Sequence, residues 1–531
     1  MTSTPSSNPT PPPTSPNPET FLADPTLPSR MRTALTAAGF TFDAVAAALG
    51  ERGHAALGRN ETTPGERATR GGTPLETLTR LFLLQRPVSR AHADAALPGL
   101  VEEMVTAGIL TTEGATVRAL LDVRPYAADD AAAPTEETAE SANQAGERDL
   151  WVVSDLTPGM DGAGNQVDGD YVLGISPAST SLAQLTMRGP VGRALDLGTG
   201  CGVQSLHLAA HADEVVATDV NARALAVTRF NMALNGIDTV DVRDGSFFEP
   251  VAGEKFDLIA TNPPFVISPA TGERLVYRDS GLPGDAAVEH IVRTGPEHLT
   301  EGGWLQVLAN WVIAEGQPWD ERLASWLPED TSAFVVQREV LDPPSYVELW
   351  LKDAGLHGGP DYLERYETWV SWMEGQGIEG VGFGWINVRR DAPGTTAVRE
   401  FVEWPYDVEQ PIAPAIEQWE ASQDALAGVA SLEELARERL VLRNDVRQET
   451  QGAPGEEDPE TIVIRQQRGM RRARQVDTVE AALVGACDGD LTVGQILDAV
   501  ASLTGADPAE VRAQALPAVR EMVAEGFLDV G

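Results

Sequence analysis

The spacing of hydrophobic and polar positions changes several times along the chain, and each change marks an expected structural part. Between residues 30 and 126 apolar residues first recur at helical spacing, most clearly over 74–84. Residues 109–123 then alternate around Glu113 and Gly114, which predicts a β-hairpin. Helices followed by a hairpin favour a winged-helix-like domain over residues 30–126.

The middle of the chain alternates short apolar runs with helical segments, as parallel sheets require. This pattern predicts an α/β domain over residues 149–410 with a seven-stranded, doubly wound, Rossmann-like sheet. Its last strand, expected at 380–389, would run antiparallel to the others. An aromatic-rich segment before it, residues 361–375, has helical spacing; we expect it to pack in the core rather than to form a substrate platform.

Residues 411–531 form a second mainly helical part. Its pattern predicts three helices and a final strand, at 479–483, 493–503, 509–526 and 527–530. The segment 521–528 is similar to 103–110 in sequence, which is consistent with two copies of one fold. We therefore expect a C-terminal winged-helix-like domain.

The remaining segments are predicted to connect or extend these domains. Residues 1–29 hold nine prolines among polar residues and cannot bury a core, so we expect a disordered tail. Residues 127–148 are rich in Ala, Glu, Asp and Thr without periodicity, which predicts an acidic linker. Neither a membrane span nor a secretory signal is predicted, and Cys201 and Cys487 suggest no disulfide framework. These features favour a cytoplasmic protein.

The net charge of −41 argues against sequence-independent binding to phosphate backbones, although it leaves room for a local basic groove. The best candidate is a run of arginines without intervening acids: Arg465, Arg468, Arg471, Arg472 and Arg474. The alternative is a solvated segment that neutralises the acidic remainder. In the N-terminal domain the expected recognition helix carries Glu102 and Glu103 and no arginine, so packing or protein docking is equally open there.

Candidate chemistry begins with a glycine-rich turn after the apolar run that ends near Leu197. Gly198, Gly200 and Gly202 permit backbone angles and close approach that a Cβ would forbid. Asp219 ends the next strand about 20 residues later, where acidic residues meet ribose hydroxyls in doubly wound sheets. Alone, this pattern fits a dinucleotide fold as well as a methyl-donor site. However, Asp196 precedes a Gly-x-Gly-x-Gly spacing rather than Gly-x-Gly-x-x-Gly.

The motif Asn262-Pro263-Pro264-Phe265 has no role in hydride transfer but a specific one in methylating a planar nitrogen. An amide or nucleobase NH2 is a poor nucleophile because its lone pair is delocalised. The Asn262 side-chain oxygen and the Pro263 carbonyl can each accept one of its hydrogens and favour the charge that develops there. The two prolines fix the backbone, and Phe265 offers a flat face for stacking.

Together these motifs resemble class I S-adenosylmethionine-dependent methyltransferases of the Asn-Pro-Pro-Phe/Tyr group, over roughly residues 170–312. That group includes release-factor glutamine methyltransferases, small-domain rRNA guanine-N2 methyltransferases and adenine-N6 DNA methylases. The resemblance implies S-adenosyl-L-methionine as cofactor, with the methionine end at Gly198 and Gly200, the ribose at Asp219, and the adenine amine at Asp244 near Phe247. The implied cofactor-binding set is Asp196, Gly198, Thr199, Gly200, Gly202, Asp219, Asp244, Gly245 and Phe247.

The same resemblance places Asn262, Pro263, Pro264 and Phe265 at the reacting nitrogen. It also suggests that residues 170–185 close over the donor, although Ser179 and Thr180 are alternatively helix caps. The charged loop after the motif suggests three substrate-binding residues, Tyr277, Arg278 and Asp279. No metal is expected.

The sequence therefore predicts an S-adenosylmethionine-dependent N-methyltransferase. An exocyclic amine of a nucleobase in RNA or DNA is the first choice of target, a protein glutamine amide the second, and a small molecule the third. Two other classes compete with this interpretation: a non-catalytic nucleic-acid-binding protein that retains the donor fold, and an oxidoreductase. The oligomeric state is left open.

Overall fold

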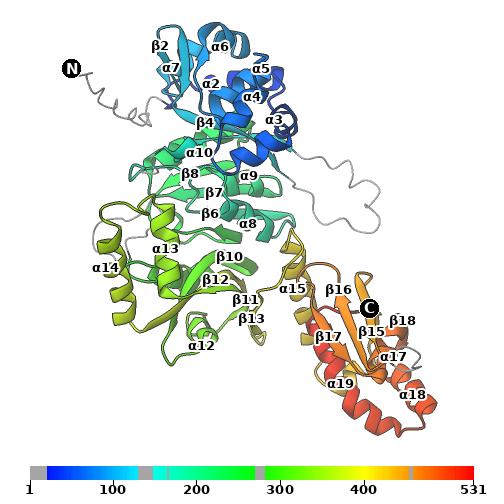
Figure 1. Ribbon diagram of the computed structural model, residues 1–531. Helices are drawn as coiled ribbons and strands as arrows, with labels where there is room; N and C mark the ends of the chain where they lie inside the picture. The colour runs from blue at the N-terminus through cyan, green and yellow to red at the C-terminus, as the bar shows by residue number, and fades with distance from the viewer. Residues whose placement is uncertain (1–20, 129–147, 164–166, 270–281, 454–458) are drawn as a thin grey trace. The chain divides into compact units, whose positions relative to one another are not determined.

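The computed structural model describes residues 21–128, 148–163, 167–269, 282–453 and 459–531 (Figure 1). The chain divides into two compact units. The first contains residues up to 183 with 188–328 and 339–391, and the second contains 184–187, 329–338 and 392–531.

The first unit begins with a mainly helical part. Its elements are α2 (Leu27–Ala37), α3 (Phe42–Leu57), α4 (Thr63–Ala68), α5 (Pro74–Leu78), η1 (Thr79–Leu83), β1 (Val88–Ser89), α6 (Arg90–Ala96), α7 (Val101–Thr106), β2 (Leu110–Glu113) and β3 (Thr116–Ala119). The predicted hairpin is confirmed as β2 and β3, and β1 pairs with the other edge of β3. The winged-helix assignment stays a prediction.

The predicted disordered tail extends too far along the chain. Only residues 1–20 lie outside the described part; Phe21 is 3% exposed and its ring centroid lies 4.4 Å from that of Phe230. Helix α2 already begins at Leu27. The folded part of the chain starts earlier than predicted because Phe21 packs against Phe230, which lies about two hundred residues later on a helix. The local composition does not reveal this contact.

The predicted linker at 127–148 falls between two paired strands, β4 (Leu121–Ala128) and β5 (Arg148–Asp155). They run antiparallel from Leu121 opposite Asp155 to Ala128 opposite Arg148. Residues 129–147 lie outside the described residues, whereas the two ends of the segment are strand. The segment thus joins the strands of one hairpin.

The central sheet has eight strands. Six belong to the first unit, in the order β12 (Ile378–Arg390), β10 (Leu299–Ala314), β9 (Phe256–Thr261), β6 (Val191–Leu197), β7 (Ala212–Asp219) and β8 (Val240–Asp244). In the second unit β11 (Thr331–Leu341) pairs in parallel with β13 (Arg399–Glu403). The predicted α/β fold and the antiparallel strand at 380–389, β12, are confirmed, but β12 is not the last strand and the sheet has eight strands rather than seven. The unpredicted eighth strand is β13, whose sequence Arg-Glu-Phe-Val-Glu carries little apolar signal.

Helices of the first unit follow the strands in the manner of a doubly wound sheet (Figure 1). They are α8 (Pro177–Leu185), α9 (Val203–Leu208), α10 (Ala222–Asn235), α11 (Ala286–Thr294), α12 (Trp319–Ala324), α13 (Pro343–Asp353) and α14 (Tyr362–Gly375). The expected core role of the aromatic segment is confirmed, because Trp369 and Met373 on α14 are 1% and 0% exposed.

The buried side chains of the parallel strands β6, β7 and β9 are mostly apolar, and the buried polar ones lie at the carboxyl ends of the strands. Thr261 Oγ1 donates to the Leu197 carbonyl at 2.7 Å, which links the loop after β9 to the loop after β6. The N–H groups of Gly198 and Thr199 both donate to the Thr218 carbonyl at 2.9 Å. The three predicted motifs therefore meet at one edge of the sheet.

The rest of the second unit is built from helices and two three-stranded sheets, β18-β14-β19 and β15-β16-β17. Its elements are α15 (Ala413–Ala427), α16 (Leu432–Leu435), β14 (Arg439–Leu442), β15 (Val446–Gln451), β16 (Thr461–Gln466), β17 (Ala473–Val476), α17 (Thr478–Ala486), β18 (Asp488–Thr492), α18 (Val493–Thr504), α19 (Pro508–Ala524) and β19 (Leu528–Val530). The predicted helices and final strand correspond to α17, α18, α19 and β19.

The similar segments 103–110 and 521–528 have the same local structure. Gly108 and Gly526 both end a helix with φ of 76°. In each case the next residue donates its N–H to the carbonyl of a buried methionine, Met104 or Met522, at 2.8 Å. Among the described residues no single helix is long and apolar enough to cross a membrane; the bent pair α2 and α3 meets the length and composition criteria together.

Candidate functional site

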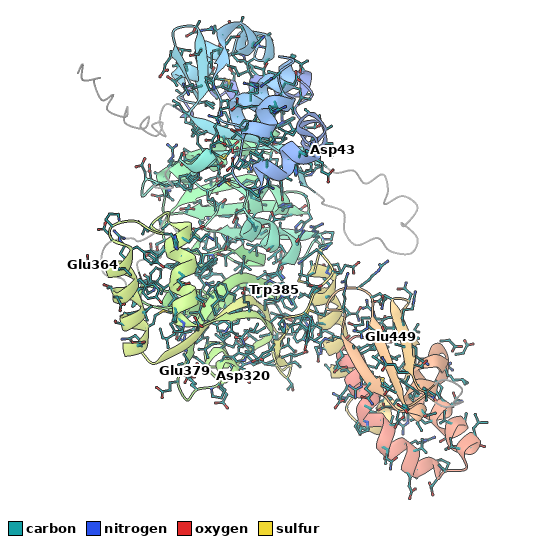
Figure 2. The ribbon with its side chains drawn as sticks, in the orientation of Figure 1. Asp43, Asp320, Glu364, Glu379, Trp385 and Glu449 are labelled. Atoms are coloured by element: carbon teal, nitrogen blue, oxygen red, sulfur yellow. The ribbon has the colours of Figure 1, made fainter. Side chains whose placement is uncertain are left out.

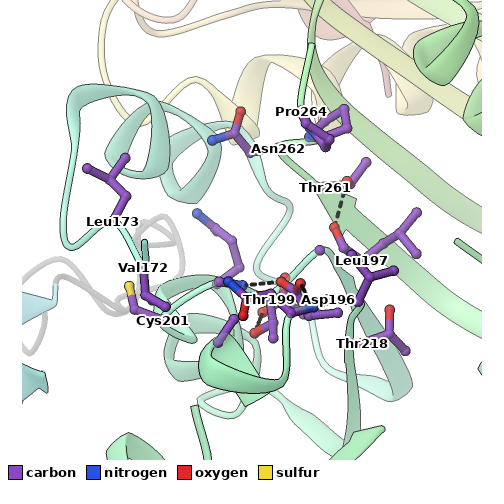
Figure 3. Close-up of a pocket in the computed structure, with 18 of the residues that line it drawn as sticks. Val172, Leu173, Asp196, Leu197, Thr199, Cys201, Thr218, Thr261, Asn262 and Pro264 are labelled. Atoms are coloured by element: carbon purple, nitrogen blue, oxygen red, sulfur yellow. Dashed lines mark hydrogen bonds between the residues drawn. The ribbon is translucent and has the colours of Figure 1, made fainter. Parts of the chain in front are cut away.

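A cavity of about 710 Å³ lies at the ends of the parallel strands (Figure 3). The loops after β6, β7, β8 and β9 and the segment 169–179 line it. The structure brings together most of the predicted site residues in this lining: Asp196, Gly198, Thr199, Gly200, Asp219, Gly245, Phe247, Asn262, Pro263, Pro264 and Phe265. Tyr277, Arg278 and Asp279 lie outside the described residues.

The three glycines of the turn have different surroundings, although each has a positive φ: 77° at Gly198, 57° at Gly200 and 86° at Gly202. A Cβ built on either of the first two would meet no atom within 4 Å. A Cβ on Gly202 would lie 3.1 Å from Met232 on α10. Gly198 and Gly200 thus leave space at the cavity, whereas Gly202, which is not in the lining, allows close helix packing.

Asp196 is a buried carboxylate at the end of β6, 1% exposed. Its Oδ2 accepts hydrogen bonds from Thr199 Oγ1 at 2.6 Å, Ser205 Oγ at 2.6 Å and Ser205 N at 2.9 Å. Burial raises the pKa of Asp196 to about 6, against the effect of these bonds, and the nearby charge of Asp219 adds to the rise. This carboxylate is held rigidly beside the glycine turn (Figure 3).

Asp219 ends β7 on the same side of the cavity. Its Oδ2 accepts from Gly200 N at 3.0 Å and its Oδ1 from Asn221 N at 2.9 Å. Burial raises the pKa of this carboxyl group above its ordinary value. Each carboxylate oxygen can accept a second hydrogen bond. Asp219 is therefore fixed in place and still has acceptor capacity for two hydroxyls of a ribose.

The loop after β8 carries the remaining predicted donor residues. Phe247 has a φ of 46°, which is rare for a bulky residue, and its ring lies edge-on to His290 with centroids 4.8 Å apart. The backbone is tied to the neighbouring strand by Gly245 N, which donates to the Asp219 carbonyl at 3.1 Å. Asp244 is exposed and is not in the cavity lining, so its adenine-binding role stays a prediction.

The side-chain oxygen of Asn262 is buried at the cavity and receives no hydrogen bond from any described residue. Figure 3 shows Asn262 and Pro264 across the cavity from Asp196 and Thr199. An unpaired buried acceptor is unfavourable, costing about 1–3 kcal/mol. A ligand with an N–H group would relieve this cost.

The Asn-Pro-Pro-Phe loop is supported from behind by aromatic side chains that sequence reasoning did not connect with the site. Ile267 N donates to Tyr346 Oη at 2.8 Å, and Trp369 Nε1 donates to the Ile267 carbonyl at 2.9 Å. The Phe265 ring packs edge-on against Trp350, with centroids 6.1 Å apart. The helices α13 and α14 thus hold the backbone that follows the motif.

The segment before α8, from Gly169 to Ser176, also lines the cavity. Ser176 caps α8, because Ser179 N donates to Ser176 Oγ at 3.2 Å. Asp170 is tied to the second motif by Asn221 Nδ2, which donates to its carbonyl at 2.9 Å. Ser176 N in turn donates to Ser179 Oγ at 2.9 Å, so the expected capping role is confirmed for Ser179, which also lines the cavity.

Gln204 on α9 is a lining residue that the sequence analysis missed. It is 6% exposed; its Nε2 donates to the Ser179 carbonyl at 2.7 Å, and its Oε1 is buried without a hydrogen bond. The available signal was a glutamine just after the glycine turn, at the start of a short helix.

Three arginines of the basic cluster form ion pairs: Arg465 with Glu449 at 2.8 Å, Arg472 with Glu400 at 2.7 Å, and Arg474 with Glu521 at 2.6 Å. The other two members, Arg468 and Arg471, are exposed. These pairs favour the neutralising interpretation over a phosphate-contacting patch.

Comparison with known families supports the central domain. Residues 174–323 match the family model "Methyltransferase small domain", and residues 37–120 and 417–530 match two models that are each described as a "Domain of unknown function", DUF7059 and DUF7782. This confirms the resemblance of the central domain to small-domain, class I methyltransferases, whose methyl donor is S-adenosylmethionine.

Three curated relatives align with this domain. A release factor glutamine methyltransferase of Xylella fastidiosa is 35% identical over 131 residues, 22% of this chain and 47% of that protein. A ribosomal RNA small subunit methyltransferase C of Salmonella arizonae is 36% identical over 121 residues, 22% and 31% of the two chains. A ribosomal protein uL3 glutamine methyltransferase of Bradyrhizobium diazoefficiens is 36% identical over 126 residues, 22% and 40%. The chain spans less than half the length of these relatives.

Proposed function

We propose that this protein is an S-adenosylmethionine-dependent N-methyltransferase whose target is a planar NH2 group held by Asn262 and Pro263. The observation that carries the proposal is the unpaired, buried Oδ1 of Asn262, placed across the cavity from the glycine turn and Asp196. An oxidoreductase has no use for this acceptor, and a retired scaffold has no reason to keep it.

The other wall of the cavity suits the donor. Gly198 and Gly200 leave room for the methionine end, and Asp219 has acceptor capacity for the ribose hydroxyls. Asp196 supplies a buried carboxylate for a cationic group. When bound, S-adenosylmethionine supplies an electrophilic methyl group on a sulfonium.

The target side is suited to orienting a weak nucleophile. Asn262 Oδ1 and the Pro263 carbonyl can accept the two hydrogens of the NH2 group, which directs the nitrogen lone pair at the methyl carbon and favours the positive charge that forms. The proton becomes acidic once the N–C bond has formed and leaves to water, so no general base is required. Tyr346 and Trp369 keep the loop in place.

Charge distribution favours a protein glutamine amide over the nucleobase amine that the sequence analysis placed first. Three aspartates line the cavity, Asp170, Asp196 and Asp219, and no lysine or arginine does within the part of the chain that the structure describes. Exposed acidic side chains in the same unit include Asp43, Glu364 and Glu379 (Figure 2). A phosphate backbone would be repelled by such surroundings, whereas a neutral amide side chain would not.

The substrate is tested by incubating the protein with methyl-labelled S-adenosylmethionine and separate protein, RNA and DNA pools. We expect label in protein, recovered as N5-methylglutamine after proteolytic digestion. Label in a methylated base would instead identify nucleic acid as the substrate. Binding of S-adenosylhomocysteine without any labelled pool would favour the non-catalytic scaffold. If calorimetry showed binding of NAD but not of S-adenosylhomocysteine, the oxidoreductase interpretation would replace this proposal. The predicted cytoplasmic location stays a prediction.

A further inference from the structure

The wall formed by α9 contains a second unpaired acceptor, the Oε1 atom of Gln204. The side chain is more than nine-tenths buried, at 6% exposure, and belongs to the cavity lining. Its Oε1 receives no hydrogen bond from any described residue. Asn262 Oδ1 is the other such oxygen in this lining. A buried acceptor that has no protein partner and lines a ligand-sized cavity is available to a donor group of a bound ligand.

The orientation of the Gln204 amide is fixed by its own donor. Nε2 donates to the Ser179 carbonyl at 2.7 Å, and a carbonyl oxygen can only accept. Rotating the amide by half a turn would place two oxygens against each other. The oxygen of Gln204 therefore stays directed away from Ser179, and only a group with an N–H or O–H can satisfy it.

The reactants offer few groups of this kind. The two hydrogens of the target NH2 group are matched by Asn262 Oδ1 and the Pro263 carbonyl. The ribose hydroxyls are matched by Asp219. The adenine amine of the donor is expected at the loop after β8, near Phe247. The remaining group is the α-ammonium of the donor, which carries three N–H bonds and a positive charge.

The position of Gln204 in the chain fits this assignment. It follows the glycine turn by two residues, and the next residue, Ser205, donates two hydrogen bonds to the Asp196 carboxylate. Asp196 at the end of β6 and Gln204 at the start of α9 flank the glycine turn in the cavity lining, and a carboxylate and an amide oxygen are both acceptors for an ammonium group.

We propose that Gln204 binds the methyl donor, with its Oε1 accepting a hydrogen bond from the α-ammonium of S-adenosylmethionine. This assignment rests on the proposed function. It gives Gln204 a role in donor affinity that is separate from the target side of the cavity.

The test is a double-mutant cycle between one side chain and one ligand group. Wild type and Gln204→Met are titrated calorimetrically with S-adenosylhomocysteine and with its desamino analogue, in which hydrogen replaces the α-amino group. We expect Gln204→Met to weaken S-adenosylhomocysteine binding by roughly 10- to 100-fold, the range for a hydrogen bond to a charged group. The desamino analogue should bind both proteins with dissociation constants within about twofold of each other.

A matched control is Gln306→Met. Gln306 is a fully buried glutamine on β10 outside the cavity lining, so this change should lower thermal stability and leave both dissociation constants as in wild type. If Gln204→Met fails to fold, Gln204→Asn retains the amide but withdraws it by one methylene, and the same selective loss is expected.

Three results for Gln204→Met would overturn the proposal. They are an equal loss of affinity for both ligands, unchanged affinity for both ligands, and unchanged donor affinity together with a raised KM for the methylated substrate. The last result would move Gln204 to the target side. Failure of the wild-type protein to bind S-adenosylhomocysteine would instead refute the proposed function itself.

Discussion

The two walls of the cavity differ in how their polar groups are used. On the donor wall, Asp196 accepts three hydrogen bonds and Asp219 accepts one on each oxygen, all from the protein itself, and among the described residues Gln204 Oε1 is the unpaired acceptor there. On the target wall, Asn262 Oδ1 accepts none from the described residues. The two carboxylates of the donor wall are held in place before any ligand binds, so little of their conformational freedom is lost on binding. The target wall keeps an acceptor whose partner is the substrate.

The largest effect should come from removing the unpaired acceptor. Asn262→Ala is expected to lower kcat by about 10²- to 10³-fold, as for other groups that stabilise developing charge. The dissociation constant of S-adenosylhomocysteine should change by less than about twofold, because Asn262 contacts only the target. Single-turnover rates and calorimetry measure the two quantities.

Asn262→Asp is the matched variant. It keeps an acceptor oxygen and replaces the amide NH2 by a second oxygen in nearly the same volume, so it should be more active than Asn262→Ala. An alanine variant with unchanged turnover, or with equal losses of turnover and donor affinity, would remove the distinction between the walls.

The next effect concerns the ribose contact. Asp219→Ala should weaken S-adenosylhomocysteine by roughly 10- to 100-fold, since hydrogen bonds to a charged acceptor are lost. Asp244→Ala sharpens the comparison, because Asp244 is exposed and outside the lining. We expect its loss of affinity to be the smaller of the two in calorimetry. A larger loss at Asp244 would mean that the donor lies nearer β8 than we propose.

Donor affinity should also depend on pH through Asp196, whose pKa is raised to about 6 by burial. Above this pH the carboxylate is ionised and attracts the donor's ammonium group; below it the group is neutral. Affinity for S-adenosylhomocysteine should therefore fall about tenfold between pH 7 and pH 5, the range in which Asp196 gains its proton while the ligand stays an ammonium ion. Asp196→Asn should bind more weakly and lose this dependence. An identical pH profile in the variant would show that another group titrates.

The smallest effect is expected behind the target loop. Tyr346→Phe removes the acceptor for Ile267 N and leaves a buried N–H unpaired, at a cost of about 1–3 kcal/mol of unfolding free energy. We expect kcat to fall by less than about tenfold through misplacement of the loop. Denaturant titration and turnover measure these changes. If Tyr346→Phe lowered donor affinity more than turnover, Tyr346 would support the donor wall instead of the target wall.

The sequence predicted the parts of this site that local pattern controls. Apolar runs that end at Leu197, Asp219 and Thr261 are strands of one parallel sheet, so the residues after them had to meet at one edge. The glycine spacing and the Asn-Pro-Pro-Phe motif then indicated what chemistry that edge carries.

Long-range pairing explains what the sequence did not reveal. The partners of Arg472 and Arg474 are Glu400 and Glu521, so the apparently basic segment is largely neutralised by residues far along the chain. Tyr346 reaches Ile267 across 79 residues for the same reason. Periodicity assigns a side chain to a face of an element but does not determine which distant group it meets.

The most direct test of the central claim is a crystal structure of the protein with S-adenosylhomocysteine. We predict the ribose hydroxyls within hydrogen-bonding distance of Asp219, and the sulfur facing the open space beside Asn262 Oδ1 and the Pro263 carbonyl. A ligand bound with its adenine against Asn262, or an Asn262 oxygen turned away to a partner within the protein, would contradict the account.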